Sequence, residues 1–167
     1  IYTACKYYEI FQQRGFKKCA IISSYTPQIG DLRTDTVSAD DETETFEKYD
    51  IYLRMLGLDP DNLPEKISIQ KRVEDFEETV KDKFINEPAN MKLLIVVDKL
   101  LTGFDAPPCT YLYIDKSMQD HGLFQAICRV NRLDGDTKEF GYIVDYKQLF
   151  GDLKNAMDKY TSGAFEN

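Results

Sequence analysis

The chain has 167 residues, of which 43% are hydrophobic, and this composition favours one compact domain with a buried core over a disordered segment. Its formal net charge of -8 argues against a stand-alone nucleic-acid binder, because such proteins usually present a basic patch or stripe. The longest apolar run, Leu93 to Val97, is too short to cross a bilayer, so we expect no association with a membrane. The chain begins with Ile1 rather than Met, and we therefore expect it to be part of a longer polypeptide.

The cysteines argue against a metal centre. Cys5, Cys19, Cys109 and Cys128 are widely spaced, and His121 is the one histidine in the sequence. Neither spacing nor histidine content fits a zinc site, which usually pairs two close ligands with two more. Reduced thiols inside a cytoplasmic protein are the expectation instead.

Hydrophobic periodicity predicts five elements in the first half of the chain. Gly15 and Pro88 stand where two of the helices would end. The predicted elements are a helix over 3–14, a strand over Cys19 to Ser23, a loop over 25–45 with a dense acidic run, a helix over 44–56 and a long helix over 65–86.

The second half alternates short strands with helices. Leu93 to Val97 is an uninterrupted apolar run, which is typical of a strand buried on both faces of a parallel sheet. Further strands are predicted over 110–114 and 142–144, with helices over 123–132 and 146–160. This alternation predicts an α/β fold with a mostly parallel sheet covered by helices on both faces. We expect a single domain over 1–167, with an acidic insertion of loop and helix over 26–64.

A segment rich in turn residues follows the apolar run. Gly103 permits a positive φ or a close approach of the backbone to a ligand, Asp105 could accept hydrogen bonds from a sugar hydroxyl, and Pro107 stiffens the exit. In an open α/β sheet, ligands bind beyond the carboxyl ends of the strands, where this segment would lie. An ordinary turn with a helix-capping Asp explains the same residues.

Two arginines and a glutamine follow at helical spacing. Gln125, Arg129 and Arg132 are at positions i, i+4 and i+7, so a helix would place them on one face. The opposite face would pack on the sheet through Leu123, Ile127 and Val130. Neighbouring guanidinium groups favour an anion between them, and a triphosphate fits their planar forks. The alternative is a solvated basic face paired with the acidic run.

In this order, LLTGFDAP and QAICRVNR resemble motifs V and VI of superfamily 2 helicases and translocases. With YLYIDK between them and GYIVDY after them, the chain is similar to the motor (R) subunit of type I restriction enzymes. The resemblance implies a RecA-like three-layer sandwich, the helicase C-terminal lobe. It also implies ATP-dependent translocation of double-stranded DNA that precedes cleavage.

The resemblance assigns roles to the residues of both motifs. Arg132 corresponds to the arginine finger that reaches the γ-phosphate, and Arg129 to its companion on the same phosphate. Gln125 would help to orient that site, and Asp105 would contact the ribose or couple to the finger. Cys128 departs from the pattern, because many members carry Gly there.

The same resemblance assigns contacts with the DNA backbone. Thr102 and Gly103 correspond to the turn that links nucleotide and DNA phosphates. Ser23 and Ser24, at the end of the first predicted strand, stand where motif IV would contact the nucleic acid.

No GxxxxGK[ST] phosphate-binding loop and no nuclease signature occur in the sequence. We therefore expect ATP and Mg²⁺ to be bound mainly by a first RecA-like lobe elsewhere in the polypeptide, and the isolated chain to bind no cofactor and to be inactive. Expected partners are that first lobe, double-stranded DNA, and the modification and specificity subunits of a restriction complex in the prokaryotic cytoplasm.

Two other interpretations remain open at this point. The chain could be the C-terminal lobe of another superfamily 2 DNA or RNA helicase. It could also be a non-catalytic α/β module that presents its arginines to an acidic protein surface. The split ATP site requires Arg132 to lie beside Asp105.

Overall fold

A computed structural model describes most of the chain and divides it into two compact units, Ile1–Lys99 and Leu100–Asn167, which are treated separately below. The described residues are 1–28, 39–63, 68–100, 103–118, 120–135, 138–149, 151 and 154. Part of the acidic insertion expected over 26–64 lies outside these ranges.

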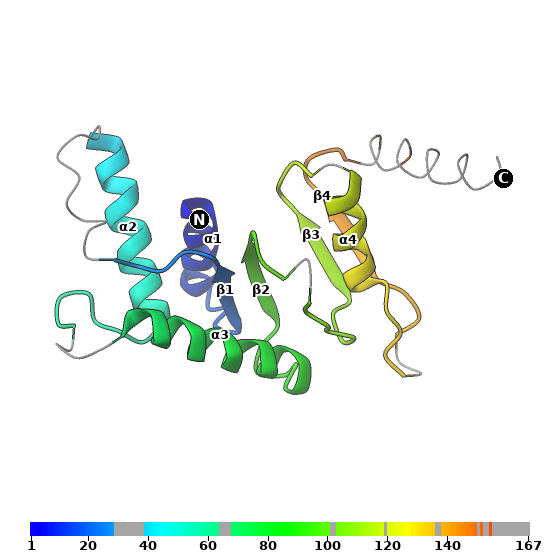
Figure 1. The fold of residues 1–167 in the computed structure, drawn as a ribbon, viewed down its shortest axis with the longest axis horizontal. Helices are drawn as coiled ribbons and strands as arrows, with labels where there is room; N and C mark the ends of the chain where they lie inside the picture. The colour runs from blue at the N-terminus through cyan, green and yellow to red at the C-terminus, as the bar shows by residue number, and fades with distance from the viewer. Residues whose placement is uncertain are drawn as a thin grey trace. The chain divides into compact units, whose positions relative to one another are not determined.

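Within its described residues, the first unit combines three helices with a two-stranded parallel sheet (Figure 1). Its elements are α1 (Tyr2–Gln13), β1 (Cys19–Ser23), α2 (Ala39–Met55), α3 (Ile69–Asn86) and β2 (Leu93–Val97). Both strands have the bounds that the sequence predicted, and their register pairs Cys19 with Leu93 and Ser23 with Val97. Parallel pairing places the carboxyl ends of β1 and β2 at the same edge of the sheet.

The ends of α1 and α3 follow from local sequence signals. Gly15, just after α1, has a φ of 81°, a left-handed conformation that glycine adopts without steric cost. The side chain of Ser68 caps α3 by accepting a hydrogen bond from the backbone N–H of Lys71. α3 begins at Ile69, four residues later than predicted, and residues 65–67 of the predicted helix lie outside the described ranges.

Helix α2 begins at Ala39, five residues before the predicted start. The acidic run from Asp40 onward therefore falls in a helix and not in the loop that its charge density predicted. Negative charge in the first turn favours a helix, because the helix dipole is positive at its amino end.

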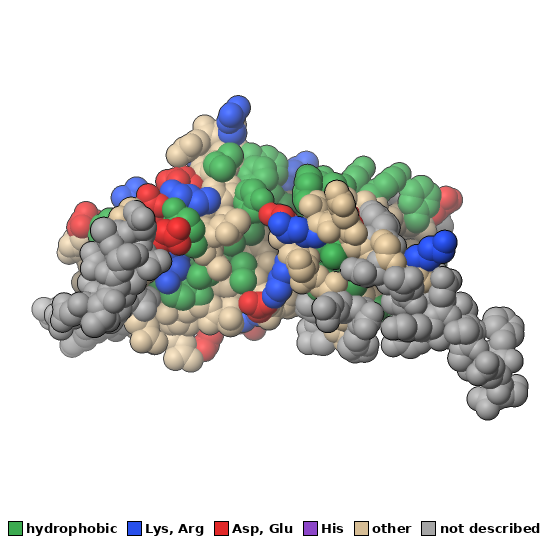
Figure 2. All heavy atoms as spheres, turned by 90° about the horizontal axis from the view of Figure 1, so that it is seen from above, with side chains coloured by type: hydrophobic (Ala, Val, Ile, Leu, Met, Phe, Trp, Pro, Cys, Tyr) green, Lys and Arg blue, Asp and Glu red, His purple; other side chains and the backbone are tan. Residues whose placement is uncertain are grey.

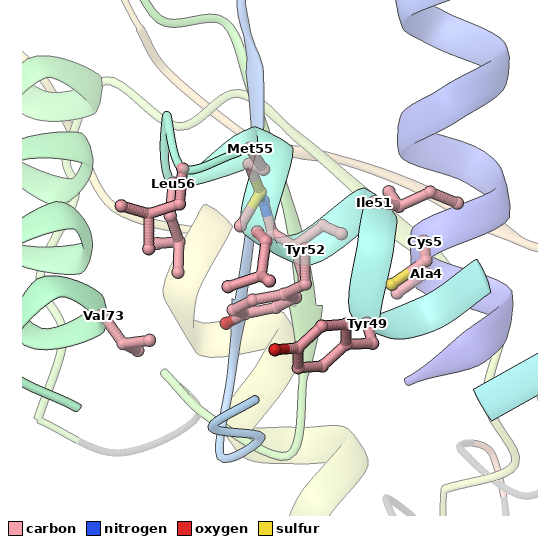
Figure 3. Packing of buried hydrophobic residues seen from close by; sticks show 11 residues of the cluster. Ala4, Cys5, Tyr49, Ile51, Tyr52, Met55, Leu56 and Val73 are labelled. Atoms are coloured by element: carbon pink, nitrogen blue, oxygen red, sulfur yellow. Dashed lines mark hydrogen bonds between the residues drawn. The ribbon is translucent and has the colours of Figure 1, made fainter. Parts of the chain in front are cut away.

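The core of the first unit gathers side chains from α1, α2, α3 and β1. Figure 3 shows Cys5 of α1 and Val73 of α3 on either side of Tyr52 from α2. Every residue of β1 is buried, whereas Val96 of β2 is 41% exposed. The prediction that β2 is buried on both faces is wrong for this unit, because the described elements cover only part of that strand.

The second unit contains β3 (Tyr111–Ile114), α4 (Asp120–Val130) and β4 (Tyr142–Asp145). β3 and β4 pair in parallel, as predicted. One face of this sheet packs against α4 through an apolar cluster with Ile114 and Leu123 at its centre. Most of the predicted helix over 146–160 lies outside the described residues.

The other face of this sheet carries exposed tyrosines. Tyr111, Tyr113 and Tyr142 are each about half exposed, and the rings of Tyr111 and Tyr142 stack with centroids 4.8 Å apart. Strand alternation places them opposite Leu112 and Ile114. Within the described part of this unit, α4 covers one face, so the fold is mixed α/β with short parallel sheets.

On the face shown in Figure 2, Lys and Arg side chains lie next to Asp and Glu side chains. None of the helices within the described ranges is long and apolar enough to cross a membrane.

Candidate functional site

The segment that follows β2 begins with residues in the left-handed region. Asp98, Leu100 and Gly103 have φ values of 56°, 64° and 74°. Such values are uncommon for residues other than glycine, and they cluster at functional sites because the surroundings must impose them. A Cβ at Gly103 would have nothing within 4 Å, so the backbone conformation, and not crowding, explains glycine here.

Asp105 and Arg132, two residues of the predicted site, form an ion pair. Nη1 of Arg132 lies 2.5 Å from Oδ1 of Asp105, and the two side chains are 42% and 57% exposed. Ion pairs this exposed stabilise a fold by about 0–1 kcal/mol. Separating the pair therefore costs little free energy when another anion binds the guanidinium.

Arg129 binds the residue just before Asp105. It lies in the last turn of α4, and its Nη1 donates a hydrogen bond to the backbone carbonyl of Phe104 at 2.8 Å. Two arginines thus contact consecutive residues of one segment. Gln125 lies half-buried on the same helix.

The prediction that Arg132 shares a helix face with Gln125 and Arg129 is wrong, because α4 ends at Val130. Gly141 approaches that end closely: a Cβ there would lie 2.3 Å from the carbonyl oxygen of Val130. Arg132 therefore belongs to the loop after the helix, and it reaches Asp105 from there.

The apolar support of the arginines agrees with the sequence. Leu123 and Val130 are 3% and 1% exposed, and Ile127 packs against the same cluster as the two strands. The predicted packing of this helix face on the sheet is confirmed for Leu123 and Ile127.

Ser23, the last residue of β1, and Ser24, which follows it, have different environments. Ser23 is 1% exposed, and its hydroxyl lies 3.2 Å from the hydroxyl of Tyr52 and accepts a hydrogen bond from the backbone N–H of Tyr25. Ser24 is exposed and is the member of the pair that an external phosphate could reach. Thr102 lies outside the described residues.

Glu77 is a residue of this region that the sequence analysis missed. It is 7% exposed on α3, accepts a hydrogen bond from the backbone N–H of Ser23, and binds Nζ of Lys99 through both carboxylate oxygens at 2.9 Å. One carboxylate thus ties the end of β1 to the residues that follow β2. Its position between Val73 and Val80 on the apolar face was the available signal, since a carboxylate there must be buried.

Lys138 was missed as well. It is 7% exposed, and its ammonium donates hydrogen bonds to the carbonyl oxygens of Pro107 and Cys109 at 2.7 and 2.6 Å. No pattern in the sequence marks it, because it lies in a loop and its acceptors are backbone atoms about thirty residues earlier.

The cysteines differ in accessibility. Cys5 is fully buried, and desolvation raises the pKa of its thiol to about 11. Burial also raises the pKa of Cys109, while the nearby ammonium of Lys138 acts in the opposite direction. Cys128 is exposed on α4. Within the described ranges, His, Cys, Asp and Glu do not gather in a group of three that could hold a metal ion.

Comparison with known proteins identifies the family of this chain. The family model of type I restriction enzyme subunit R domain 3 matches residues 1–148. A Methanocaldococcus jannaschii protein, provisionally named type I restriction enzyme MjaVIIP endonuclease subunit, is 44% identical over 104 residues, which are 60% of this chain and 10% of that protein. The type I restriction enzyme HindI endonuclease subunit of Haemophilus influenzae is 42% identical over 87 residues, 51% of this chain and 8% of its own.

A staphylococcal relative agrees with these two. The type I restriction enzyme SsaAORF53P endonuclease subunit of Staphylococcus saprophyticus is 44% identical over 69 residues, 41% of this chain and 7% of its own. The chain thus spans about a tenth of the length of the curated relatives that it matches. Since the family model covers most of its residues, the chain belongs to the type I restriction enzyme subunit R domain 3 family.

Proposed function

We propose that this chain is the second, RecA-like motor lobe of a type I restriction enzyme R subunit, and that it supplies the arginine finger for ATP-driven translocation of double-stranded DNA before cleavage. The observation that carries the proposal is the ion pair between Arg132 and Asp105. It joins the two residues that a split ATP site requires side by side, although they are far apart in the sequence.

The geometry around the pair would allow the guanidinium of Arg132 to bind a phosphate. The guanidinium of Arg132 is held by a carboxylate yet remains 42% exposed. A γ-phosphate can accept two parallel hydrogen bonds from the guanidinium of Arg132, and it carries more negative charge than a carboxylate. Asp105 is then released toward the ribose or remains as a coupling contact, while Arg129 keeps the segment in place through Phe104.

ATP and Mg²⁺ would be held mainly by a first RecA-like lobe of the same polypeptide, because this chain lacks the phosphate-binding loop. In phosphoryl transfer the protein mainly positions groups and neutralises charge. Hydrolysis would then require the two lobes to close, and repeated closing and opening would move them along DNA. Gln125 and Gly103 would border the nucleotide.

Contacts with the DNA backbone would come from Thr102 and Ser24, with buried Ser23 holding the turn that presents Ser24. The modification and specificity subunits would complete the complex in the cytoplasm. Sequence recognition would belong to the specificity subunit.

The test uses the intact polypeptide, assembled in its restriction complex. Arg132→Ala and Arg132→Lys should lower DNA-dependent ATP hydrolysis by about a thousandfold and abolish translocation, because lysine keeps the charge but lacks the planar fork. DNA binding should stay close to wild type, since the finger acts on the nucleotide. The matched control is Arg54→Ala, which removes a 70% exposed arginine paired with Asp50 in the same chain.

Wild-type translocation by the Arg132→Lys variant would rule out the finger assignment. A second measurement concerns the isolated chain, which should show no ATP hydrolysis. Hydrolysis by the purified chain that Arg132→Ala abolishes would contradict the split site.

A further inference from the structure

The loop between α4 and β4 contains a buried cation. Lys138 is 7% exposed, and its ammonium donates to the carbonyl oxygens of Pro107 and Cys109 at 2.7 and 2.6 Å. Lysine is almost never buried to this extent, because removing an ammonium from water is costly unless its donors are satisfied. Two of its three donors are satisfied here by the backbone that follows Asp105.

The backbone of Lys138 is tied to a different place. Asp134 and Lys138 form an antiparallel bridge, in which the N–H of Asp134 donates to the carbonyl of Lys138 at 3.4 Å. Asp134 follows Arg132 by two residues. One residue therefore binds the stretch after Arg132 through its backbone and the stretch after Asp105 through its side chain.

These contacts close a ring. The ion pair joins Arg132 to Asp105, and the backbone continues from Asp105 to Pro107. The carbonyl of Pro107 accepts a hydrogen bond from the ammonium of Lys138. The backbone of Lys138 pairs with Asp134, two residues after Arg132. Arg132 stands beyond the end of α4, so the helix does not fix its backbone. Of the two links across the ring, the exposed ion pair is weak and the buried ammonium is the stronger.

We propose that Lys138 is a positioning residue that sets the place of Arg132 relative to the segment carrying Asp105. The proposal rests on the proposed function of Arg132 as the arginine finger. Lys138 keeps the segments that carry Arg132 and Asp105 connected when Arg132 leaves Asp105 for the γ-phosphate, so the backbone of Arg132 stays in place while its side chain moves. A displacement of about 1 Å at such a group costs up to a hundredfold in rate, whereas ground-state binding depends mainly on the other lobe.

The test compares three variants in the intact polypeptide within its restriction complex. Lys138→Met keeps the length of the side chain but removes its donors, and Lys138→Arg keeps charge and donors. The matched control, Lys147→Met, removes a half-exposed lysine that pairs with Asp115 in the same unit. Lys138→Met should lower kcat for DNA-dependent ATP hydrolysis at least about tenfold, with KM for ATP changed less than about twofold. Lys138→Arg should recover most of the rate, and Lys147→Met should match the wild type.

A double variant separates positioning from a general loss of structure. If Lys138 acts through Arg132, Lys138→Met should have almost no further effect in an Arg132→Ala background. An equal factor of loss in both backgrounds would overturn the proposal, as would a Lys138→Met enzyme with wild-type kcat. If Arg132→Ala itself leaves hydrolysis intact, the proposed function fails, and this outcome is distinct from the failure of Lys138 alone.

A chemical readout tests the contact when the variant enzyme is unstable. The ammonium of Lys138 favours the thiolate of Cys109, so the Arg and Met variants differ in how fast iodoacetamide alkylates that thiol. Peptide mass spectrometry should show Cys109 alkylated more slowly in Lys138→Met than in the wild type and Lys138→Arg, relative to exposed Cys128. Equal rates in all three proteins, or faster alkylation in Lys138→Met, would count against an ammonium held beside Cys109.

Discussion

Glu77 and Lys99 of the first unit meet beside a core to which three helices and a strand contribute. Arg132 and Asp105 of the second unit meet at an exposed surface, beside an apolar cluster in which Ile114, Leu123 and Leu149 are the buried members described. The first pair has a 9% exposed carboxylate, whereas both partners of the second pair are more than 40% exposed.

This difference in exposure gives the two ion pairs different properties. A buried carboxylate cannot exchange its partner without leaving an uncompensated charge, so Glu77 fixes the ends of β1 and β2 permanently. An exposed pair exchanges its partner at little cost, so Arg132 is suited to bind a ligand. We therefore expect substitutions at Glu77 to act mainly on stability and those at Arg132 to act mainly at the site.

The largest expected effect is in the core of the first unit. Leu53 is fully buried on α2, and Leu53→Ala should lower the free energy of unfolding by about 2–5 kcal/mol, because it leaves a cavity. Urea unfolding followed by circular dichroism measures the loss. Leu133→Ala is the control, since Leu133 is 74% exposed in the second unit and should change stability by less than about 0.5 kcal/mol. Similar losses in both variants would break the comparison.

Gly141→Ala should have the next largest effect. A Cβ there would meet the carbonyl oxygen and carbon of Val130 at 2.3 and 2.7 Å, and backbone atoms cannot move aside as a flexible side chain can. We expect the free energy of unfolding to fall by about 3 kcal/mol, the upper range for overpacking. In the intact polypeptide we also expect slower ATP hydrolysis, because the end of α4 shifts beside Arg132. Gly122→Ala in the same helix meets nothing closer than 3.7 Å and should be neutral or stabilising in the same unfolding assay. A neutral Gly141→Ala would show that the close approach is not required.

Alkaline pH should destabilise the first unit. The pKa of Cys5 is raised by burial from 9.0 to about 11, so the folded state keeps the proton longer than the unfolded state does. This contribution is fully present below pH 9 and is lost as the pH rises through 11, with a total on the order of 2 kcal/mol. Tyr52, whose pKa is raised to about 12, extends the loss to higher pH. Melting temperatures from pH 8 to 11 should fall less steeply for Cys5→Ala than for wild type, and parallel slopes would contradict this origin.

Gly103→Ala should have the smallest effect on stability. Its φ of 74° strains an alanine by roughly 1 kcal/mol, but the added methyl group would meet no atom within 4 Å. The same denaturation measurement should therefore show a loss well below that of Gly141→Ala. A loss as large as that of Gly141→Ala would mean that the segment is packed more tightly than its geometry indicates.

Much of the fold was predictable because short apolar runs and helix stop signals are local. The bounds of β1 and β2 follow from uninterrupted apolar residues, and the end of α1 follows from Gly15. The start of α2 did not, because an acidic run fits both a solvated loop and the first turn of a helix. The three-layer sandwich remains a proposal.

The site was predictable in its residue types more than in its construction. The motif sequences indicated Asp105, Arg129 and Arg132. In the structure Arg132 pairs with Asp105, and Arg129 donates a hydrogen bond to the neighbouring Phe104. Glu77 was missed because it lies among apolar residues of α3. Lys138 was missed because it donates hydrogen bonds to backbone carbonyls, which have no sequence signature. Such contacts depend on which loops meet and cannot be derived from spacing along the chain.

The sequence by itself determined the family, the parallel strands, the apolar face of α4 and the identity of the charged residues, because each depends on nearby residues or on motif wording. The tertiary structure alone decided that Arg132 lies beyond its helix, that Ser23 is buried while Ser24 is exposed, and that Lys138 closes the ring around Asp105. The physical reason is that burial and ion pairing arise between segments distant along the chain. Local propensity sets where a helix can run, whereas the approach of Gly141 to Val130 sets where α4 meets its neighbour.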